Sequence, residues 1–283
     1  MDLYQAILQR RSVRRYRNRP LDKQTLEMVD DIIDHALPLV PENRFRVMRR
    51  DVVTGEDLIA AMGGYGRILT PPHYMVAYAI GDRMPLTDLG YRMEQVAVQM
   101  VQIGLSVSFI GSLNREANVR VRFRLNSEAR TGAFLIFGYA AESAPDRTIN
   151  AVLRRRSGGG SRLDVEEFFF DSAFDQPTAP PKDIAQLIEA ARRAPSANNA
   201  QPWRFLWQGD TLYLFLQKEN PRYGNNPALQ EYRYFDGGTC MGNVKMAMDA
   251  LNIPGEWNLL KTSRVGVPDH PETLEPLAKL TLP

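Results

Sequence analysis

Cysteine is almost absent from the chain. Cys240 is the only one, so no disulfide can form within the molecule. A single thiol also provides no cysteine cluster for zinc or an iron–sulfur centre. His35, His73 and His270 lack the close spacing of metal ligands. We therefore expect no bound metal, and we expect His73 to be structural or to form the wall of a substrate pocket.

Long apolar runs are missing as well. No stretch approaches the roughly 18 consecutive apolar residues of a membrane-spanning helix. The first residues lack the charged and apolar regions of a signal peptide. Together with the single cysteine, these absences predict a cytoplasmic protein that has no membrane partner.

Charge of one sign is not in excess. Lys and Arg number 35 and Asp and Glu 33, and the resulting net charge of +2 does not favour nucleic acid as a partner. Arginines gather at 10–19 and 154–162, but neither cluster has the interleaved aromatics of a single-strand-binding groove. For each cluster taken alone, a solvated basic face is the simplest interpretation.

Two common enzyme signatures are also absent. Ser196 lacks the flanking glycines of a hydrolase nucleophile elbow, and no glycine-rich dinucleotide fingerprint opens a helix. What the chain does contain is 44% hydrophobic and 24% charged residues over 283 positions. This is enough for two packed units.

Helix and strand patterns recur in the same order along the chain. The first part predicts helices at 2–9, 20–37 and 88–105 and strands at 45–53, 74–80, 107–110 and 133–139. The second part predicts helices at 184–194 and 236–251 and strands at 205–208 and 211–216. Between them, residues 157–161 read Ser-Gly-Gly-Gly-Ser, and we interpret this segment as a linker rather than a phosphate cradle.

Matched positions keep a constant offset, which indicates an internal duplication. Asp88 and Gly90 in the first long helix correspond to Asp236 and Gly238 in the second, and the apolar positions that follow stay in step. We therefore expect a first half over 1–156, a linker over 157–163 and a second half over 164–283.

Each half keeps one polar element that the other lacks. Residues 10–14 read Arg-Arg-Ser-Val-Arg, whereas the matching segment 168–172 is Phe-Phe-Phe-Asp-Ser. Residues 194–203 read Ala-Pro-Ser-Ala-Asn-Asn-Ala-Gln-Pro-Trp, and the first half has a shorter segment, 37–44, in that place. A site that needs both elements can be complete only once in the chain.

These two strings resemble the hallmark pair of the FMN-dependent nitroreductase family. In that family the protein is a homodimer, and each FMN lies at the interface. The Arg-Arg-Ser turn of one subunit contacts the phosphate, and the Pro-Ser-x-x-Asn loop of the other contacts the ring. Here one chain carries both, so it is similar to a fused dimer. The resemblance implies an α+β nitroreductase fold, built as two similar halves that form a pseudo-dimer around one FMN.

The first string suits an FMN phosphate, because guanidinium groups and a hydroxyl at a turn bind phosphate oxygens well. In an extended turn Arg10, Ser12 and Arg14 point to the same side, while Arg11 points elsewhere or offers its backbone N–H. The alternative is a charged helix end. Arg14 is also our candidate for stabilising the reduced flavin, which carries negative charge.

The second string supplies ring contacts by resemblance. Pro195 is expected to pack near the isoalloxazine, and Ser196 and Asn199, with Asn198 between them, are expected to offer hydrogen bonds to its polar edge or ribityl chain. The alternative is a turn that ends a helix, for which Pro, Ser and Asn are equally suited.

Three further segments correspond to cofactor contacts in the family. The resemblance assigns the backbone amides of Gly111 and Ser112 to flavin N5, with a strand end as the alternative. It also assigns a phosphate contact to Arg162, with Arg156 in reserve. Residues 63–66 could approach the flavin, although a simple loop is the stronger interpretation.

The resemblance implies an oxidoreductase in which NAD(P)H binds transiently, reduces the flavin and leaves. A small-molecule acceptor, such as a nitro compound or a quinone, then takes the electrons in a ping-pong cycle. A monomer would suffice for this reaction. Two alternatives remain open: a flavin carrier or sensor without turnover, and a flavin-fragmenting or dehalogenating relative of the same fold.

Overall fold

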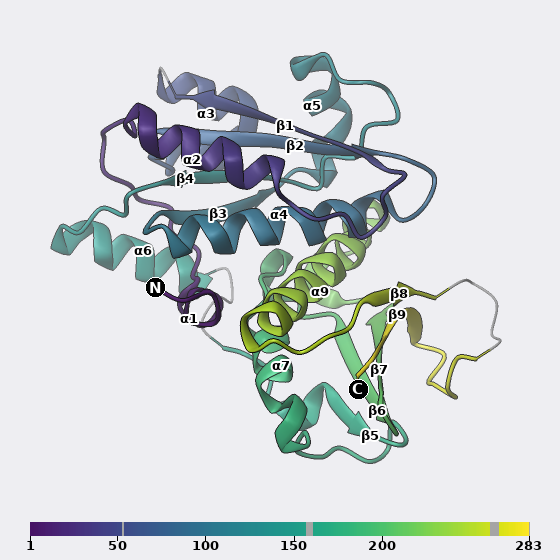
Figure 1. Cartoon of the computed structure of the whole chain (residues 1–283). Coiled ribbons are helices and arrows are strands. Elements are labelled where there is room, and N and C mark those ends of the chain that lie inside the picture. The colour runs from purple at the N-terminus through teal and green to yellow at the C-terminus, as the bar shows by residue number, and fades with distance from the viewer. Residues whose placement is uncertain (53, 157–160, 261–265, 283) are drawn as a thin grey trace.

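The computed structural model describes residues 1–52, 54–156, 161–260 and 266–282, and in it two β-sheets lie on either side of a central pair of helices (Figure 1). The elements of the first half are α1 (Leu3–Gln9), α2 (Lys23–Asp34), β1 (Arg44–Asp51), α3 (Gly55–Met62), β2 (His73–Ile80), α4 (Pro85–Gln102), β3 (Ser106–Gly111), α5 (Glu116–Phe123), β4 (Ala133–Gly138) and α6 (Ala144–Arg156). The elements that follow are β5 (Phe169–Asp171), α7 (Lys182–Arg193), β6 (Trp203–Gln208), β7 (Thr211–Gln217), α8 (Pro227–Gln230), α9 (Tyr232–Leu251), β8 (Trp257–Leu259) and β9 (Leu274–Thr281).

The two sheets have the same strand order. The first runs β1-β2-β4-β3, and the second runs β6-β7-β9-β8 after its edge strand β5. These matched strands pair antiparallel throughout. A shared order along two stretches of one chain is what an internal duplication produces, and it supports the duplication predicted from the sequence.

The central helices α4 and α9 pack against each other where each has a glycine. A Cβ added at Gly90 would clash with the carbonyl oxygen of Phe235, and one added at Gly238 would clash with that of Thr87. Thr87 and Phe235 are themselves matched positions, so the contact is reciprocal, as at a two-fold interface. The Asp-x-Gly pattern in the sequence therefore marks the pseudo-two-fold axis of the molecule.

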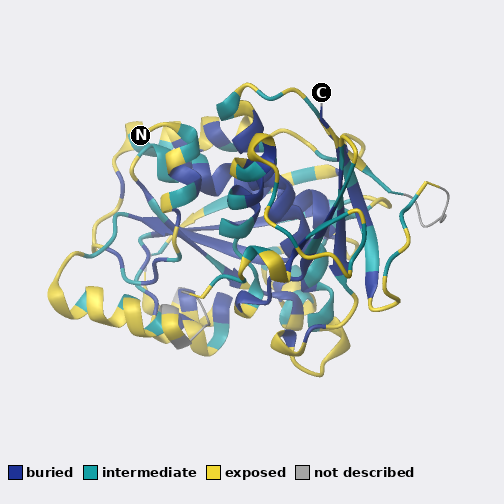
Figure 2. Cartoon of the chain, turned by 90° about the horizontal axis from the view of Figure 1, so that it is seen from below, coloured by how far each residue is buried: buried dark blue, intermediate teal, exposed yellow. Residues whose placement is uncertain are grey.

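Burial follows the same arrangement. Nearly all of α4 and the whole of β4 are buried, and buried residues run through the middle of the molecule (Figure 2). Helix α4 is buried as predicted, but it ends at Gln102 rather than at 105. Gly104 takes a left-handed conformation there (φ +91°), which is a common way for a helix to stop.

Helix α7 leads directly into the polar loop of the second half. Its buried positions Ile184, Leu187, Ile188 and Ala191 recur at helical spacing, so one face packs into the core. The helix ends at Arg193, because a residue that precedes proline avoids the helical region and Ala194 is extended (ψ 141°). The loop therefore starts at a fixed point on the core.

The segments 10–14 and 168–172, matched in the sequence, do not occupy equivalent places. Ser12 bridges to Val107 in β3, whereas β5 pairs in parallel with β6, the counterpart of β1. The two segments therefore extend their sheets at opposite edges, and that part of the sequence match was wrong. Each segment pairs with the sheet edge whose backbone groups are free to bond with it. The pattern of side chains in the sequence does not specify which edge that is.

Three helices of the first half, α3, α5 and α6, were not predicted. In α5 only Val119 is buried, and in α6 Ile149 and Val152 are exposed, so neither has an apolar stripe that a sequence pattern could reveal. Helix α6 ends at Arg156, and residues 157–160 of the expected linker lie outside the described residues. No described helix is long and apolar enough to cross a membrane.

Candidate functional site

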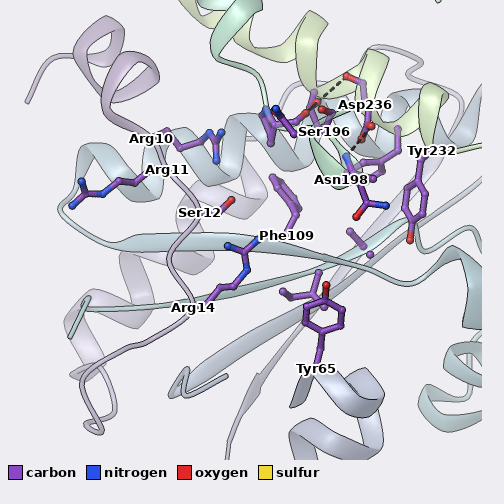
Figure 3. Close-up of a pocket in the computed structure, with 18 of the residues that line it drawn as sticks. Arg10, Arg11, Ser12, Arg14, Tyr65, Phe109, Ser196, Asn198, Tyr232 and Asp236 are labelled. Carbon is purple, nitrogen blue, oxygen red and sulfur yellow. Dashed lines mark hydrogen bonds between the residues drawn. The ribbon is translucent and has the colours of Figure 1, made fainter. Parts of the chain in front are cut away.

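A cavity of about 870 Å³ lies where the two halves meet, within the size range of small-molecule sites. The two polar strings, far apart in the sequence, both border it (Figure 3). The predicted site residues that line it are Arg10, Arg11, Ser12, Arg14, Gly111, Arg162, Pro195, Ser196, Asn198 and Asn199. The structure therefore brings together all but one of the residues singled out from the sequence.

One end of the cavity carries several guanidinium groups. Arg10 is only 6% exposed, and its Nε lies 3.1 Å from the Oε1 of the fully buried Glu94. Its Nη1 is buried and meets no hydrogen-bond partner among the described residues. Arg162 and Arg193 line the same end. This end therefore presents more positive charge than Glu94 alone can compensate.

Burial and mutual repulsion act on the ionisation of this cluster. Burial, together with the charges of Arg10 and Arg193, lowers the pKa of Arg162 to about 10. Burial raises the pKa of Glu94 to about 7, although Arg10 and Arg162 oppose that shift. The repulsion among the arginines lowers the pKa of Arg162 in addition to burial, and an anionic ligand would relieve that repulsion.

The first string alternates as predicted. Arg10 and Arg14 are buried and Arg11 is exposed, with its side chain directed away from the other three (Figure 3). Ser12 lies between them, held by its bridge to β3. Asn150 of α6 accepts the backbone N–H of Arg14 at 2.9 Å, and burial lowers the pKa of the Arg14 guanidinium. Helix α6 therefore fixes the end of this string.

The second string is a tight loop with unusual backbone angles. Asn198, Asn199 and Gln201 all have positive φ, between 47° and 55°, which asparagine tolerates better than most residues. The Ser196 hydroxyl accepts the Gln201 N–H at 3.0 Å, and the Thr239 hydroxyl donates to the Pro195 carbonyl at 2.8 Å. These bonds hold the loop over the start of α9.

Asn199 has a different partner from the one expected. Its Oδ1 accepts a hydrogen bond from Arg162 Nη1 at 2.9 Å, and its Nδ2 donates to the Ser161 carbonyl at 2.7 Å. The side chain is 5% exposed and is directed at the arginine cluster. In this geometry Asn199 positions Arg162. Asn198 donates to the Arg222 carbonyl at 2.9 Å.

Asp236 anchors the loop from below. Its Oδ2 accepts the Ala197 N–H at 2.9 Å (Figure 3), and it also accepts the Tyr223 hydroxyl at 2.7 Å. The side chain is buried at the cavity wall, and burial raises its pKa to about 8 against the effect of both hydrogen bonds. Burial therefore favours the protonated form of Asp236.

The middle of the cavity is apolar, and Tyr232 lines the cavity next to it. Phe109, Ile110, Ala133 and Phe235 form the wall. A Cβ added at Gly111 would clash with the hydroxyl of Tyr232, so only glycine fits at that position. A flat aromatic ligand suits such a wall better than a polar one does.

Ser112 does not take the position predicted for it. It is 1% exposed and is not part of the cavity lining. Its N–H donates to the Gly132 carbonyl at 2.9 Å, and its hydroxyl bonds to Gly132 and Thr131. The Ser112 amide is therefore already engaged, and Gly111 alone of the pair borders the cavity.

Several lining residues were not found from the sequence: Arg115, Arg193, Tyr232 and Asp236. Asp236 had been noted for the duplication only. Gly63, Gly64 and Tyr65, for which a simple loop was the preferred interpretation, do border the cavity. Single residues that arrive from separate turns carry no spacing signal, so only the fold could gather them.

Two other expectations concern residues away from the cavity. His73 is buried and structural: its Nε2 accepts the Leu21 N–H at 2.9 Å, and its Nδ1 lies 2.7 Å from Asp51. The side chain of Arg156 lies outside the described residues. Among the residues that the structure describes, no group of three His, Cys, Asp or Glu side chains is placed to hold a metal.

Comparison with family models matches residues 2–219 to a family described as "Putative TM nitroreductase". The chain belongs to this nitroreductase family. The fold is the nitroreductase fold, and the family covers both strings that border the cavity.

Solved structures resemble this family member over different lengths. A "putative nitroreductase" from Thermotoga maritima is 14% identical, with a TM-score of 0.59, and the match covers 100% of this chain and 93% of that one. An FMN-dependent nitroreductase from Clostridium difficile is 19% identical (TM-score 0.41; 49% of this chain, 87% of that one). A "Putative NADH dehydrogenase/NAD(P)H nitroreductase" from Parabacteroides distasonis is 16% identical (TM-score 0.43; 50% of this chain, 88% of that one). No curated protein matches the chain.

Proposed function

We propose that the chain binds one FMN in the cavity between its halves and uses NAD(P)H to reduce small acceptors such as nitro compounds or quinones. The observation that carries this proposal is the convergence of both polar strings on a single cavity. Each string occurs once in the chain, so one cofactor per chain is expected. Because one chain supplies the whole lining, a monomer would suffice.

The lining fits FMN in charge and in shape. Arg10, Arg162 and Arg193 suit a phosphate that carries close to two negative charges, and the buried Nη1 of Arg10 has a hydrogen bond to give. The apolar wall formed by Phe109 and Phe235 suits the face of an isoalloxazine ring. A cationic end and an apolar middle together suit a ligand that is charged at one end only.

The side chains of this protein bind and position, while the cofactor supplies the two-electron redox chemistry when it is bound. Arg162, held by Asn199, and Arg10, held by Glu94, are preorganised for a phosphate. Arg14 brings a buried positive charge to the cavity, where it would stabilise negative charge on a reduced cofactor. NAD(P)H and the acceptor would occupy the remaining space in turn.

The affinities of the Arg162→Gln variant for FMN and riboflavin test the proposal. Charged hydrogen bonds contribute about 1.5–3 kcal/mol each, so the affinity for FMN should fall by about one to two decades. Riboflavin has no phosphate, and its affinity should not change. Arg155→Gln removes an exposed arginine of α6 that does not line the cavity and serves as the matched control for charge. The measurement is isothermal titration of the flavin-free chain with each ligand.

Equal losses for FMN and riboflavin would place Arg162 outside a phosphate site, and two equivalents of FMN per chain would contradict the single composite site. Turnover is tested separately by following NADPH and NADH oxidation with and without a nitroaromatic acceptor. A chain that binds FMN but never oxidises either nucleotide would be a flavin carrier rather than an enzyme.

A further inference from the structure

The cavity is also lined by Arg115, a cation outside the cluster formed by Arg10, Arg162 and Arg193. Ser12 pairs with Val107, near the start of β3. Arg115 lies beyond the other end of this strand, in the turn that follows Gly111. At about 3.3 Å per residue, the strand from Val107 to Gly111 alone spans about 13 Å. A cofactor phosphate at the Arg10 end would therefore leave Arg115 beyond the ring, where a substrate would lie.

Arg115 reaches the cavity because Gly63 has no side chain. A Cβ added at Gly63 would come to 2.5 Å from the Nη1 of Arg115, and the positive φ of Gly63 (61°) also disfavours any other residue. The guanidinium thus lies against the backbone of the turn after α3. Two segments of the first half combine to present it.

The charge of Arg115 is not neutralised by the protein. Within the described ranges its guanidinium makes no ion pair and no hydrogen bond, although it is half-buried. The neighbouring Glu116 is occupied by Arg120 and Arg130 instead. A half-buried cation with no protein partner is attracted strongly to an incoming anion, because few waters screen it.

A hydrogen-bond donor, the Tyr232 hydroxyl, lines the same cavity as Arg115, and the Arg115 charge acts on it. The Tyr232 hydroxyl accepts the Leu113 N–H at 3.0 Å, and its own hydrogen meets no acceptor among the described residues. Its pKa is raised by burial, so the hydroxyl keeps its proton at neutral pH, while the Arg115 charge acts on it in the opposite direction. The first half contributes the cation and the second half the donor.

We propose that Arg115 and Tyr232 form a subsite that recognises an anionic substituent, a carboxylate or a phosphate, on the substrate that lies over the flavin. A guanidinium fork and one hydroxyl match the oxygens of such a group. The inference rests on the proposed function and deepens it: acceptors or nucleotides that carry a charge at this position are favoured over neutral analogues.

The test compares two acceptors that differ by one charge, 4-nitrobenzoate and 4-nitrobenzamide, on the FMN-loaded chain. Arg115→Gln should lower kcat/KM for the nitrobenzoate by about 10- to 100-fold relative to the nitrobenzamide. Arg115→Lys should restore part of this preference. Arg122→Gln removes an exposed cation of α5, away from the cavity, and should leave the ratio unchanged.

A binding measurement stands beside the kinetics. Benzoate is titrated calorimetrically into the oxidised, FMN-loaded chain, with benzamide as the neutral control. Arg115→Gln should weaken benzoate about tenfold or more and leave benzamide unchanged. A third arm compares NADPH with NADH as reductant. A loss confined to NADPH would support the subsite and identify its anion as the nucleotide phosphate.

The outcomes separate the two proposals. If the wild-type chain does not bind FMN, the proposed function fails. If it binds FMN but Arg115→Gln changes neither the benzoate preference nor the NADPH preference, the subsite alone is overturned. Weaker FMN binding with unchanged riboflavin binding in Arg115→Gln would place the cofactor phosphate at this end and would also overturn it.

Discussion

Asp88 and Asp236 occupy matched positions at the start of the two central helices, yet their electrostatic surroundings differ. Asp88 forms a buried ion pair with Arg92, one turn further along α4, at 3.2 Å. The position that matches Arg92 in α9 is Cys240, which provides no charge. Asp236 instead accepts a hydroxyl hydrogen from Tyr223, and burial raises its pKa to about 8.

Both carboxyl groups perform the same architectural task. Asp88 accepts the N–H groups of Leu39 and Val40, and Asp236 accepts that of Ala197, so each holds the loop that precedes one of the matched strands β1 and β6. In the first half Arg92 also donates to the Val40 carbonyl and ties that loop down. Without an arginine, the loop of the second half borders the cavity. In this duplicated fold both copies keep an aspartate that holds the loop, but only the loop of the second copy borders the cavity.

The largest expected effect comes from Asp88→Asn. It leaves the Arg92 guanidinium, whose side chain is only 10% exposed, without its carboxylate in a buried position. Breaking one partner of a buried pair costs about 3–5 kcal/mol. Urea unfolding should show this loss of stability, and Asp88→Asn combined with Arg92→Leu should recover part of it. An unchanged midpoint would mean that the buried pair contributes nothing.

A smaller effect is expected where the helices cross. Gly90→Ala and Gly238→Ala each force a methyl group against a backbone carbonyl of the other helix, and overpacking of this kind costs about 1–3 kcal/mol. The pseudo-two-fold axis predicts similar losses for the two. Gly55→Ala, where an added Cβ meets nothing within 4 Å, is the control. A large loss at one glycine and none at the other would break the symmetry inferred for the crossing.

The smallest effect on stability is expected for Asp236→Asn at acidic pH. The stability difference from the wild type should then grow as the pH rises. The folded-state pKa of Asp236 lies above the ordinary 3.8, at about 8, so the folded chain holds a proton that the unfolded chain releases. Stability from this group is therefore fully present below pH 3.8 and falls as the pH rises towards 8. Asparagine stays neutral, so the variant should gain stability over the wild type by at most about 1.4 kcal/mol per pH unit across that window.

Thermal unfolding between pH 5 and 8 measures this difference. Asp249→Asn, which changes an exposed carboxylate paired with Lys245 on the same helix, should leave the pH dependence as it is in the wild type. Glu94, whose pKa is raised to about 7, adds a slope of the same sign to both proteins. Parallel curves for the wild type and Asp236→Asn would show that Asp236 is ionised throughout.

Much of the candidate site was predictable because its residues are neighbours in the sequence. Strings such as 10–14 and 194–203 carry their own pattern, and Arg10 and Arg14 follow the alternation of an extended chain. Ser112 was misassigned because the sequence cannot tell which backbone amides a sheet will use, and here Gly132 takes that hydrogen bond. For Asn199 we expect a hydrogen bond to the flavin's polar edge or ribityl chain, and its bond to Arg162 is a tertiary contact that the sequence did not indicate.

The sequence by itself determined the duplication, the order of the main helices and strands, the two polar strings and the family to which they point. These features are local or periodic, so spacing and composition record them. Only the tertiary structure decided that 10–14 lies along β3, that Gly63 makes room for Arg115, and that Asp236 stands without a counter-charge. Such features arise from contacts between distant segments, because burial, close approach and pairing depend on the packed chain rather than on neighbouring residues.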